Sequence, residues 1–417
     1  MTSRPATILQ IVPELETGGA ELSAIEIAAA IRAAGGRALV ASEGGRLECE
    51  LAAAGGELVR LPVASKNPAT MLANARRLAE IARREGCHLI HARSRAPAWS
   101  GLLAASRAGV PFMTTYHGAY NEKGPLKRLY NSVMVRGRLV IANSHYTADL
   151  IRSRYGTPDA RIRVIHRGVG TQFDPNRVPA EEIDALRARW GVVEGQRIIL
   201  LAGRLTGWKG QRVLIDAFER IATDAIAEDA VVVLAGDHQG REGYREGLVQ
   251  QARAAGLAHR VLLVGHETNM PAAFRAAHVA VVASTEPEAF GRTAVEAQAM
   301  GTPVIATRHG APPETVLAPP AEPGGRPGSG GEQTGWLVTP GDRNDLARTI
   351  LAALALDGDA RERIGRSARQ HVRCHFTTDV MKAKTLRVYD EVLGAEAAAG
   401  TVRAFGGQPL TEPSDGR

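Results

Sequence analysis

The chain has 417 residues, of which 44% are hydrophobic and 23% charged, a composition typical of a globular protein with a sizeable core. This length exceeds that of one ordinary domain and predicts two or three. No apolar run approaches the roughly 20 residues that span a bilayer, and the start of the chain lacks the apolar segment of a secretory signal, so we expect a cytoplasmic protein. Three widely spaced cysteines suggest no disulfide or metal framework: Cys49, Cys87 and Cys374.

Positive charge is concentrated in the first part of the chain. The net charge is +7 overall, but residues 1–170 carry +10 and the remaining residues −3. Such asymmetry indicates that the N-terminal half meets an anionic partner.

Short apolar runs alternate with helical stretches along the chain. The runs expected as strands are 6–12, 37–42, 57–63, 88–94, 111–117, 138–144, 162–168, 197–203, 230–237, 260–266, 278–284 and 303–308. The stretches with helical periodicity are 21–34, 69–84, 97–108, 145–155, 342–355, 360–371 and 377–393. Because the strands are apolar almost throughout, they predict parallel sheets covered by helices on both faces.

This alternation predicts an α/β fold with two doubly wound domains. We expect the first over residues 1–175 and the second over 176–375, with a C-terminal helix over 376–394 that crosses back to the first domain. Residues 318–333 read as a Pro/Gly-rich surface loop, and residues 395–417 as a disordered tail. Parallel α/β sheets bind ligands at the carboxyl ends of their strands, so we expect the site in a cleft between the domains.

Two turns at predicted strand ends have features of a phosphate site. Gly18 and Gly19 follow the first strand and let the backbone approach a ligand at the start of a helix, although paired glycines are also common in ordinary turns. Arg204 and Lys209 lie five residues apart after the strand over 197–203. They can converge on one anion, although a solvated turn would have the same sequence pattern.

Three acids follow the predicted strand over 278–284. Glu286 and Glu288 lie in the loop after it, and Glu296 lies in the next helix, whose entrance at Gly291 offers free N–H groups. Carboxylates accept hydrogen bonds from sugar hydroxyls, so acids beside a cationic phosphate site would suit a nucleotide sugar. The preference of a helix N-terminus for an acid explains one glutamate but not the set.

Two histidines, His91 and His117, end neighbouring strands of the first domain. A single histidine is more often structural. Two at consecutive strand ends that face a cleft leave a functional role open for both.

The stretch EAFGRTAVEAQAMGTPVIA, residues 288–306, resembles the E-x7-E signature of the retaining family-4 glycosyltransferases. This resemblance implies the GT-B fold, two Rossmann-like domains facing across a cleft. Residues 91–99, His-Ala-Arg-Ser-Arg-Ala-Pro-Ala-Trp, are similar to bacterial members that act on lipopolysaccharide or other cell-envelope glycans. Further agreement comes from Gly-Gly-Ala-Glu (18–21), Tyr-His-Gly (116–118), Ala-Asn-Ser (142–144), Arg-Gly-Val (167–169), Gly-Arg-Leu…Lys-Gly (203–210), Ala-Gly-Asp (235–237) and Gly-Trp-Leu-Val…Gly-Asp (335–342).

The resemblance implies a role for each candidate residue and names His117, Arg204, Lys209 and Glu288 as the catalytic group. It also implies a UDP- or GDP-sugar donor, a glycan or lipid-linked acceptor, and no metal, and the sequence has no Asp-x-Asp motif. The implied roles are Arg204 and Lys209 at the diphosphate, the Gly19 N–H at the phosphate nearest the sugar, Glu288 at hexose hydroxyls, Glu296 at the ribose, His117 near the reaction centre, and Phe290 and Gly291 elsewhere in the nucleotide-sugar site.

The expected reaction is retaining hexosyl transfer by front-face attack, in lipopolysaccharide or cell-envelope polysaccharide biosynthesis. Two alternatives stay open. One is a GT-B-shaped sugar-nucleotide epimerase or phosphorylase, and the other is a nonenzymatic membrane-surface scaffold with a relic nucleotide site. The sequence departs from the family's pattern at His166-Arg167-Gly168, where Pro-Asn-Gly is more usual.

Residues 123–138 hold five cations that alternate with apolar residues at helical spacing. Such a helix lies on an anionic membrane surface, or it packs in the core with a solvated cationic face. The resemblance favours the membrane, because many relatives act on lipid-linked acceptors there. We therefore expect peripheral attachment to the inner face of the cytoplasmic membrane and no nucleic-acid partner. The apolar residues concerned are Leu126, Leu129, Tyr130, Val133 and Met134.

Overall fold

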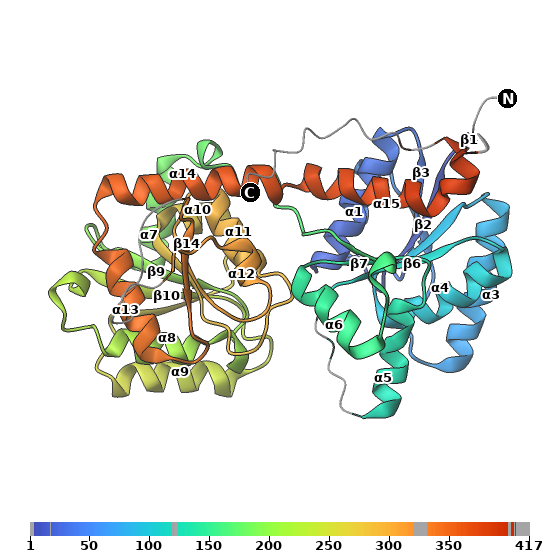
Figure 1. The fold of residues 1–417 in the computed structure, drawn as a ribbon. Coiled ribbons are helices and arrows are strands. Elements are labelled where there is room, and N and C mark those ends of the chain that lie inside the picture. Colours follow the sequence, from blue (N-terminus) through green and yellow to red (C-terminus); the bar gives the residue numbers. More distant parts are fainter. Residues whose placement is uncertain are drawn as a thin grey trace. The chain divides into compact units, whose positions relative to one another are not determined.

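A computed structural model of the protein describes residues 4–16, 18–118, 120, 124–320, 332–398, 402–403 and 405. The chain forms two compact units (Figure 1). The first unit comprises the described residues of Met1–Gly168 and Thr378–Arg417, and the second comprises those of Val169–Thr377. Among the described residues, no helix combines the length and apolar character needed to cross a bilayer.

The first unit is built on a seven-stranded sheet of parallel strands in the order β4-β3-β2-β5-β6-β7-β8. The central strands are buried from end to end, which explains their continuous apolar sequence. The strands are β2 (Thr7–Ile11), β3 (Arg37–Ser42), β4 (Glu57–Arg60), β5 (Leu89–Ala92), β6 (Phe112–Tyr116), β7 (Val140–Ala142) and β8 (Ile162–Val164). The helices are α1 (Gly19–Ala33), α2 (Glu48–Ala53), α3 (Pro68–Arg84), α4 (Arg95–Ala108), α5 (Pro125–Asn131), α6 (His145–Tyr155) and α15 (Thr378–Ala398).

The C-terminal helix α15 belongs to the first unit, although it follows the second in sequence. It packs against α1, and its buried side chains join the core on that face of the sheet. Within the segment 395–417, α15 continues to Ala398, β15 (Val402–Arg403) pairs in parallel with β1 (Arg4–Pro5), and Phe405 is buried. The other residues of that segment lie outside the described part of the chain.

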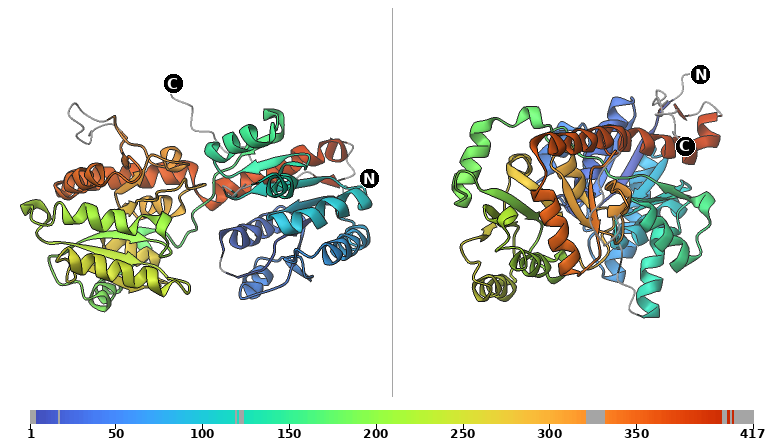
Figure 2. Two further views of the ribbon diagram at one scale, coloured as in Figure 1. Left: turned by 90° about the horizontal axis from the view of Figure 1, so that it is seen from below. Right: turned by 60° about the vertical axis from the view of Figure 1, so that its left-hand side comes forward.

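The second unit has a six-stranded parallel sheet in the order β11-β10-β9-β12-β13-β14. Its two faces are covered by different helices (Figure 2): α8, α9 and α13 pack on one face, and α7, α10 and α11 on the other. The strands are β9 (Arg197–Ala202), β10 (Ala230–Ala235), β11 (Val261–Gly265), β12 (Ala277–Val282), β13 (Val304–Thr307) and β14 (Gly335–Val338). The helices are α7 (Ala180–Trp190), α8 (Gln211–Glu219), α9 (Glu242–Ala254), α10 (Met270–Ala276), α11 (Arg292–Ala299), α12 (Pro312–Thr315), α13 (Arg343–Leu354) and α14 (Gly358–His375).

Both sheets have the doubly wound form, and the predicted fold class is confirmed. In each sheet the chain first adds strands toward one edge and then returns to the centre to build toward the other. The strand order therefore reverses between β2 and β5 in the first unit and between β9 and β12 in the second. Such switch points are where open α/β sheets bind ligands. Most of the Pro/Gly-rich stretch 318–333 lies outside the described residues.

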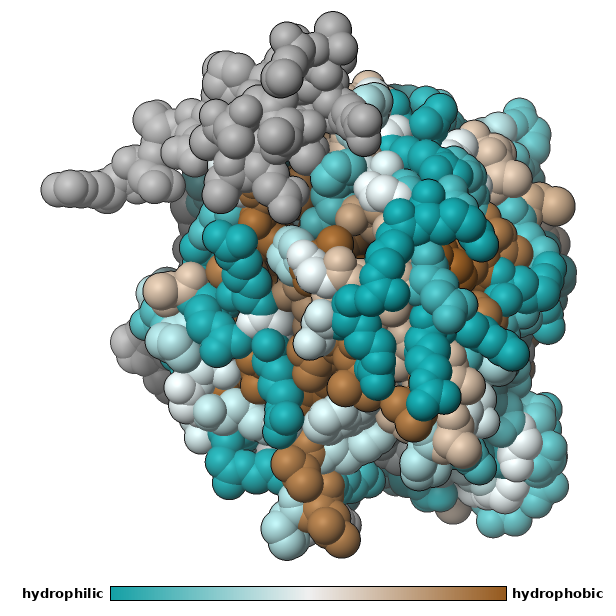
Figure 3. Space-filling view, turned by 90° about the vertical axis from the view of Figure 1, so that its right-hand side faces the viewer, coloured by the Kyte–Doolittle hydropathy of each residue, from teal (hydrophilic) through white to brown (hydrophobic). Residues whose placement is uncertain are grey.

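The predicted basic helix is not one amphipathic element. It is a short helix, α5, followed by a 3-10 turn, Ser132–Val135, in which Val133 and Met134 are fully buried. By contrast, Leu126 is 81% exposed and Leu129 is 55% exposed. Figure 3 views the molecule from the right-hand side of Figure 1. It shows apolar residues at the lower end, the height at which α5 lies in Figure 1. The apolar residues of this segment thus have two different positions. Val133 and Met134 pack in the core, whereas Leu126 and Leu129 project from the surface.

Candidate functional site

In the second unit, the loops after β9 and β12 meet at the switch point of the sheet. Gly210 ends the first loop with φ +79°, and a Cβ there would lie 1.9 Å from the carbonyl oxygen of Ala283, so only glycine allows this close approach. The Thr285 N–H donates to the carbonyl of Trp208 at 2.7 Å and ties the second loop to the first. The two loops are therefore fixed next to each other at this end of the sheet.

Lys209 and Glu288, which lie on these two loops, form an ion pair. Lys209 Nζ is 2.6 Å from Glu288 Oε1, and the side chains are only 15% and 10% exposed. The Ser284 hydroxyl donates to the same carboxylate oxygen at 2.6 Å. Lys209 Nζ also lies 4.5 Å from the centre of the Trp208 ring. Both donors contact Oε1, and no hydrogen bond to Oε2 is formed by any described residue, which leaves that oxygen for a ligand.

A third loop, which follows β13, contacts the backbone of Glu288. Glu288 forms a β-bridge with Gly310 of this loop, and the Glu288 carbonyl accepts a hydrogen bond from the Ala311 N–H at 2.9 Å. A Cβ at Gly310 would lie 2.4 Å from the Glu288 carbonyl oxygen, so this approach also requires glycine. Glu288 is consequently contacted by residues of three strand-end loops, at its carboxylate by Lys209 and Ser284 and at its backbone by the loop of Gly310 and Ala311.

The other predicted residues of the second unit lie around this pair in different environments. Arg204 is exposed, and its carbonyl accepts a hydrogen bond from Gln211 at 2.9 Å. Glu296 pairs with Arg292 at 3.0 Å on α11, and burial raises the pKa of its carboxyl despite this cation. Gly291 precedes α11 with φ +81°. Phe290 is different, because its side chain is buried against Phe376 and serves the core.

In the first unit, Gly19 is the first residue of α1, next to the switch point between β2 and β5. The N–H groups of a helix start have no intrahelical partner. The Glu21 carboxylate folds back over Gly18, because a Cβ there would meet its Oε2 at 2.0 Å. The helix start is therefore in contact with a carboxylate of its own first turn.

His117 follows β6 and contacts Arg167, a residue at which the sequence departs from the pattern that it resembles. The Arg167 Nη2 lies 2.7 Å from His117 Nδ1. Because guanidinium only donates, Nδ1 must accept, and the imidazole proton is then on Nε2. Nε2 is shielded from water and forms no hydrogen bond with any described residue. Burial, with help from Arg167, holds the pKa of His117 well below 6.5, so the ring is neutral.

His91 has a structural position. Its Nδ1 lies 2.8 Å from the Tyr389 hydroxyl of α15, and its Nε2 lies 2.8 Å from the Thr115 hydroxyl, so both ring nitrogens are engaged inside the core. Nearby, the buried Arg93 donates twice to Gln10 Oε1, at 2.9 and 2.7 Å, and burial lowers its pKa. These contacts join α15 to the strand ends of the first unit.

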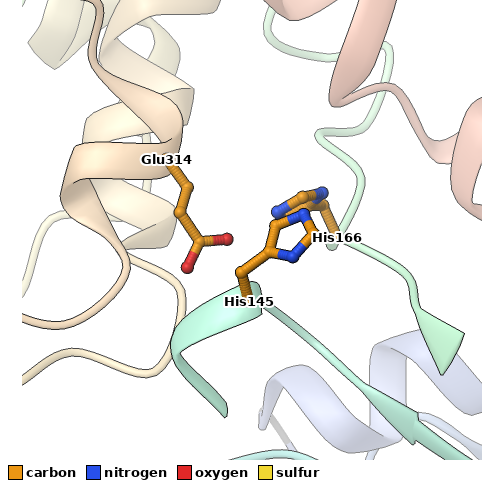
Figure 4. A group of neighbouring side chains, drawn as sticks. All are labelled: His145, His166 and Glu314. Carbon is orange, nitrogen blue, oxygen red and sulfur yellow. The ribbon is translucent and has the colours of Figure 1, made fainter. Parts of the chain in front are cut away.

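A second histidine pair lies in the first unit (Figure 4). His145 starts α6 and His166 follows β8, with ring centroids 5.7 Å apart. Glu314, also drawn there, belongs to α12 of the second unit. Structural zinc sites use four protein ligands and catalytic ones use three. Two imidazoles of one unit do not reach either number, and we assign no metal to them.

Ser284 and Trp208 were missed by the sequence interpretation, and Arg167 was noted only as a departure. Ser284 is the last residue of an apolar run and is separated from Glu286 only by Thr285, which was the available signal for it. Arg167 has no comparable signal, because its contact with His117 joins positions 50 residues apart.

Two family models match the chain: Glycosyltransferase Family 4 over residues 17–173 and Glycosyl transferases group 1 over residues 182–371. A D-inositol 3-phosphate glycosyltransferase from Salinispora arenicola is 30% identical over 337 residues, which cover 76% of this chain and 72% of that protein. The chain belongs to the family-4 glycosyltransferases.

Solved structures share the fold of this family-4 glycosyltransferase. A glycosyltransferase from Rickettsia africae has a TM-score of 0.83 and 32% identity, with 93% of this chain and 99% of that chain covered. Anabaena Alr3699/HepE, solved in complex with UDP-glucose, has a TM-score of 0.74 and 26% identity, with 92% and 99% covered. The chain is thus a GT-B glycosyltransferase.

Proposed function

We propose that this enzyme transfers a hexose from a nucleotide-diphosphate sugar to a glycan or lipid-linked acceptor with retention of configuration. The observation that carries the proposal is the pairing of Lys209 with Glu288 at the switch point, beside the exposed Arg204. A cation for phosphate and an oriented carboxylate for hydroxyls lie 2.6 Å apart there. The UDP-glucose bound by the Anabaena protein supports a UDP-sugar donor, with a GDP-sugar as the alternative.

The residues divide the donor between them. Arg204 and Lys209 bind the diphosphate, Glu288 accepts hydrogen bonds from hexose hydroxyls through its open Oε2, and Glu296 binds the ribose. Gly291 offers the N–H groups at the start of α11. Phe290 supports this loop from the core, because its ring packs against Phe376. For the first unit, we propose that the Gly19 N–H and His117 contact the donor during transfer.

The proposed catalytic role of each residue follows from the charges that develop on the donor during transfer. As the glycosidic bond breaks, negative charge grows on the leaving phosphate and positive charge on the sugar ring. Arg204 and Lys209 stabilise the negative charge on the leaving phosphate without a metal ion. The neutral His117 donates a hydrogen bond from Nε2 to the donor. We propose front-face attack, in which the leaving phosphate takes the proton of the acceptor hydroxyl. The reason is that Glu288 is assigned to the hexose hydroxyls, and no other residue of the proposed site is assigned as a nucleophile toward the sugar.

The donor assignment is tested by comparing Glu288→Gln with Glu296→Gln. A nucleotide-release screen over UDP-glucose, UDP-galactose, UDP-N-acetylglucosamine and GDP-mannose first identifies the donor. We then expect Glu288→Gln to lower transfer while UDP or GDP binding, measured by calorimetry, survives. Glu296→Gln should weaken nucleotide binding itself. Equal loss of nucleotide affinity in the two variants would contradict this division of roles.

For the acceptor, we propose a cell-envelope glycan or its lipid-linked precursor at an anionic membrane. The support is the exposed α5, where Leu126 and Leu129 project beside Lys127 and Arg128. Apolar side chains that insert and cations that attract anionic lipid are the two components of peripheral attachment. The name of the Salinispora relative favours a second acceptor, an inositol phosphate, which would need no membrane.

Vesicle sedimentation at low salt separates these acceptors. Reversal of Lys127 and Arg128 to Glu, alone and with Lys123, which lies outside the described residues, should release the protein from anionic vesicles and spare nucleotide binding. Leu126→Ser with Leu129→Ser should do the same without a charge change. If wild type and variants sediment equally, α5 is ordinary surface and a soluble acceptor is favoured.

Family membership favours the transferase over an epimerase, a phosphorylase or a scaffold. Donor turnover without an acceptor tests this choice. An epimerase would convert the donor sugar alone, and a scaffold would bind anionic vesicles without turnover.

A further inference from the structure

The second unit has a cavity of about 820 Å³ at the edge of its sheet, beside β11. It is lined by the strand itself, by the end of α7 and by α9, which cover opposite faces of the sheet. Among the described strands, β11 is hydrogen-bonded only to β10, so its other edge is unpaired. The cavity is therefore a groove whose floor offers backbone N–H and C=O groups, as an edge strand does.

The charge of this groove is positive. Glu267 is its one acid, and its carboxylate is already engaged by Arg189 at 2.5 Å, by the Trp190 N–H at 3.3 Å and by the Asn269 N–H at 2.8 Å. The guanidinium groups of Arg245 and Arg253 lie exposed on the α9 wall and form no ion pair with any described residue. Two cations that form no ion pair with a described residue thus lie on one wall beside the unpaired edge of the strand.

We propose that β11 binds an extended acidic segment of a partner protein as an added strand. Strand addition satisfies the open backbone groups of the edge, and side-chain contacts give specificity. The charge complementarity commits the groove to this occupant. A second copy of the chain would bring its own Arg245 and Arg253 to the same edge, where like charges repel.

The spacing of the α9 wall predicts the pattern of the segment. Arg245, Val249 and Arg253 are four residues apart, so they rise along the helix in steps of about 6 Å. An added strand presents every second residue to one face, at intervals of about 6.6 Å. Successive residues on that face therefore meet a cation, an apolar side chain and a cation. The expected partner sequence is acid-x-apolar-x-acid.

The test uses the full-length protein and a fluorescein-labelled peptide with the core Glu-Thr-Val-Thr-Glu, followed by anisotropy. Arg245→Glu with Arg253→Glu should weaken binding about tenfold. Arg363→Glu, an exposed cation of α14 outside the groove, is the matched control and should bind as wild type does. Nucleotide release by the double variant should be unchanged, because neither arginine lies at the switch point.

Peptide chemistry tests the strand pairing without altering the protein. A peptide methylated on alternate backbone nitrogens should bind about tenfold more weakly, and a peptide with its two acids adjacent should lose affinity as well. Equal binding of all three peptides, or no binding of the first, overturns the proposal. Displacement by millimolar inorganic phosphate would indicate a small-anion site, and a dimer lost in the double variant would indicate a second copy; either result also overturns it.

Discussion

At the residue scale, the ammonium group of Lys209 can pair either with Glu288 or with the diphosphate of a bound donor. In the described structure it is held by Glu288 and the face of Trp208. A bound diphosphate would compete for the ammonium group with two negative charges in place of one. The pair then keeps both side chains ordered before the donor arrives, which lowers the entropy cost of binding.

We expect Arg204→Ala and Lys209→Ala each to lower turnover by ~10²–10³, the usual cost of losing one preorganised electrostatic contact. Lys209→Ala should also weaken donor binding more than nucleotide binding, because it frees Glu288. Steady-state kinetics with the identified donor measure both effects. Arg220→Ala, an exposed cation at the far end of α8, is the control. Turnover within about twofold of wild type for both test variants would remove these residues from the site.

Arg167 is expected to set the protonation of His117. Burial is the largest cause that holds the pKa of His117 well below 6.5, and the positive charge of Arg167 is the next, ahead of Arg93 and His91. Arg167→Ala should raise that pKa, so more of His117 is protonated as pH falls. The imidazolium still donates from Nε2, but it adds positive charge near the sugar ring, where positive charge develops, and kcat/KM should therefore fall at acid pH relative to wild type. Arg167→Lys should restore the wild-type profile. The measurement is kcat/KM between about pH 5 and 8, and superimposable profiles would contradict the role.

At the scale of elements, α15 contacts the first unit through a buried hydroxyl, through apolar packing and through an ion pair. Tyr389 is fully buried, burial raises its pKa to about 12, and its hydroxyl contacts His91 at 2.8 Å. The surrounding side chains of α15 pack on α1, and Arg163 pairs with Glu391 at the surface. Helix α15 and the first unit therefore share apolar packing and two polar contacts, one buried and one at the surface.

Tyr389→Phe keeps the ring but removes the hydroxyl that contacts both His91 Nδ1 and the buried Arg93. An unsatisfied buried group costs about 1–3 kcal/mol, and we expect a loss of that size in the free energy of unfolding by urea. Tyr130→Phe removes a hydroxyl from a partly exposed ring of the same unit and should change stability much less. If both variants lose the same stability, the His91 contact contributes nothing specific.

At the scale of the whole molecule, the first unit is discontinuous, because its last helix follows the second unit in sequence. Buried α15 residues such as Met381, Val388 and Leu393 complete the α1 face of its core. Each buried side chain of this size contributes about 1.5–3 kcal/mol, and several together rival the 5–15 kcal/mol of a whole domain. The second unit needs none of them for its own core.

Deletion of residues 378–417 is therefore expected to unfold the first unit and leave the second folded. Differential scanning calorimetry should show one transition in place of two. UDP at 100 times its Kd should still raise the stability of that transition by about 2.7 kcal/mol, because the proposed nucleotide residues lie in the second unit. Loss of the UDP effect in the truncated chain would place the nucleotide elsewhere.

The sequence alone determined the two parallel sheets and the loops that carry the candidate residues. Short apolar runs rich in β-branched residues, such as Ala230–Ala235, favour a buried strand, and chain order then places Arg204, Lys209 and Glu288 at strand ends. The E-x7-E spacing added the family. These are local or periodic features, which a sequence displays directly.

Only the tertiary structure decided which of these residues meet. The Lys209–Glu288 pair joins positions 79 residues apart, and the His91–Tyr389 contact joins positions 298 apart. Nor did periodicity distinguish Leu126, which is exposed, from Val133, which is buried, because helical spacing is the same for a core face and a free one. Long-range packing settles such cases, since burial depends on what the rest of the chain places against each side chain.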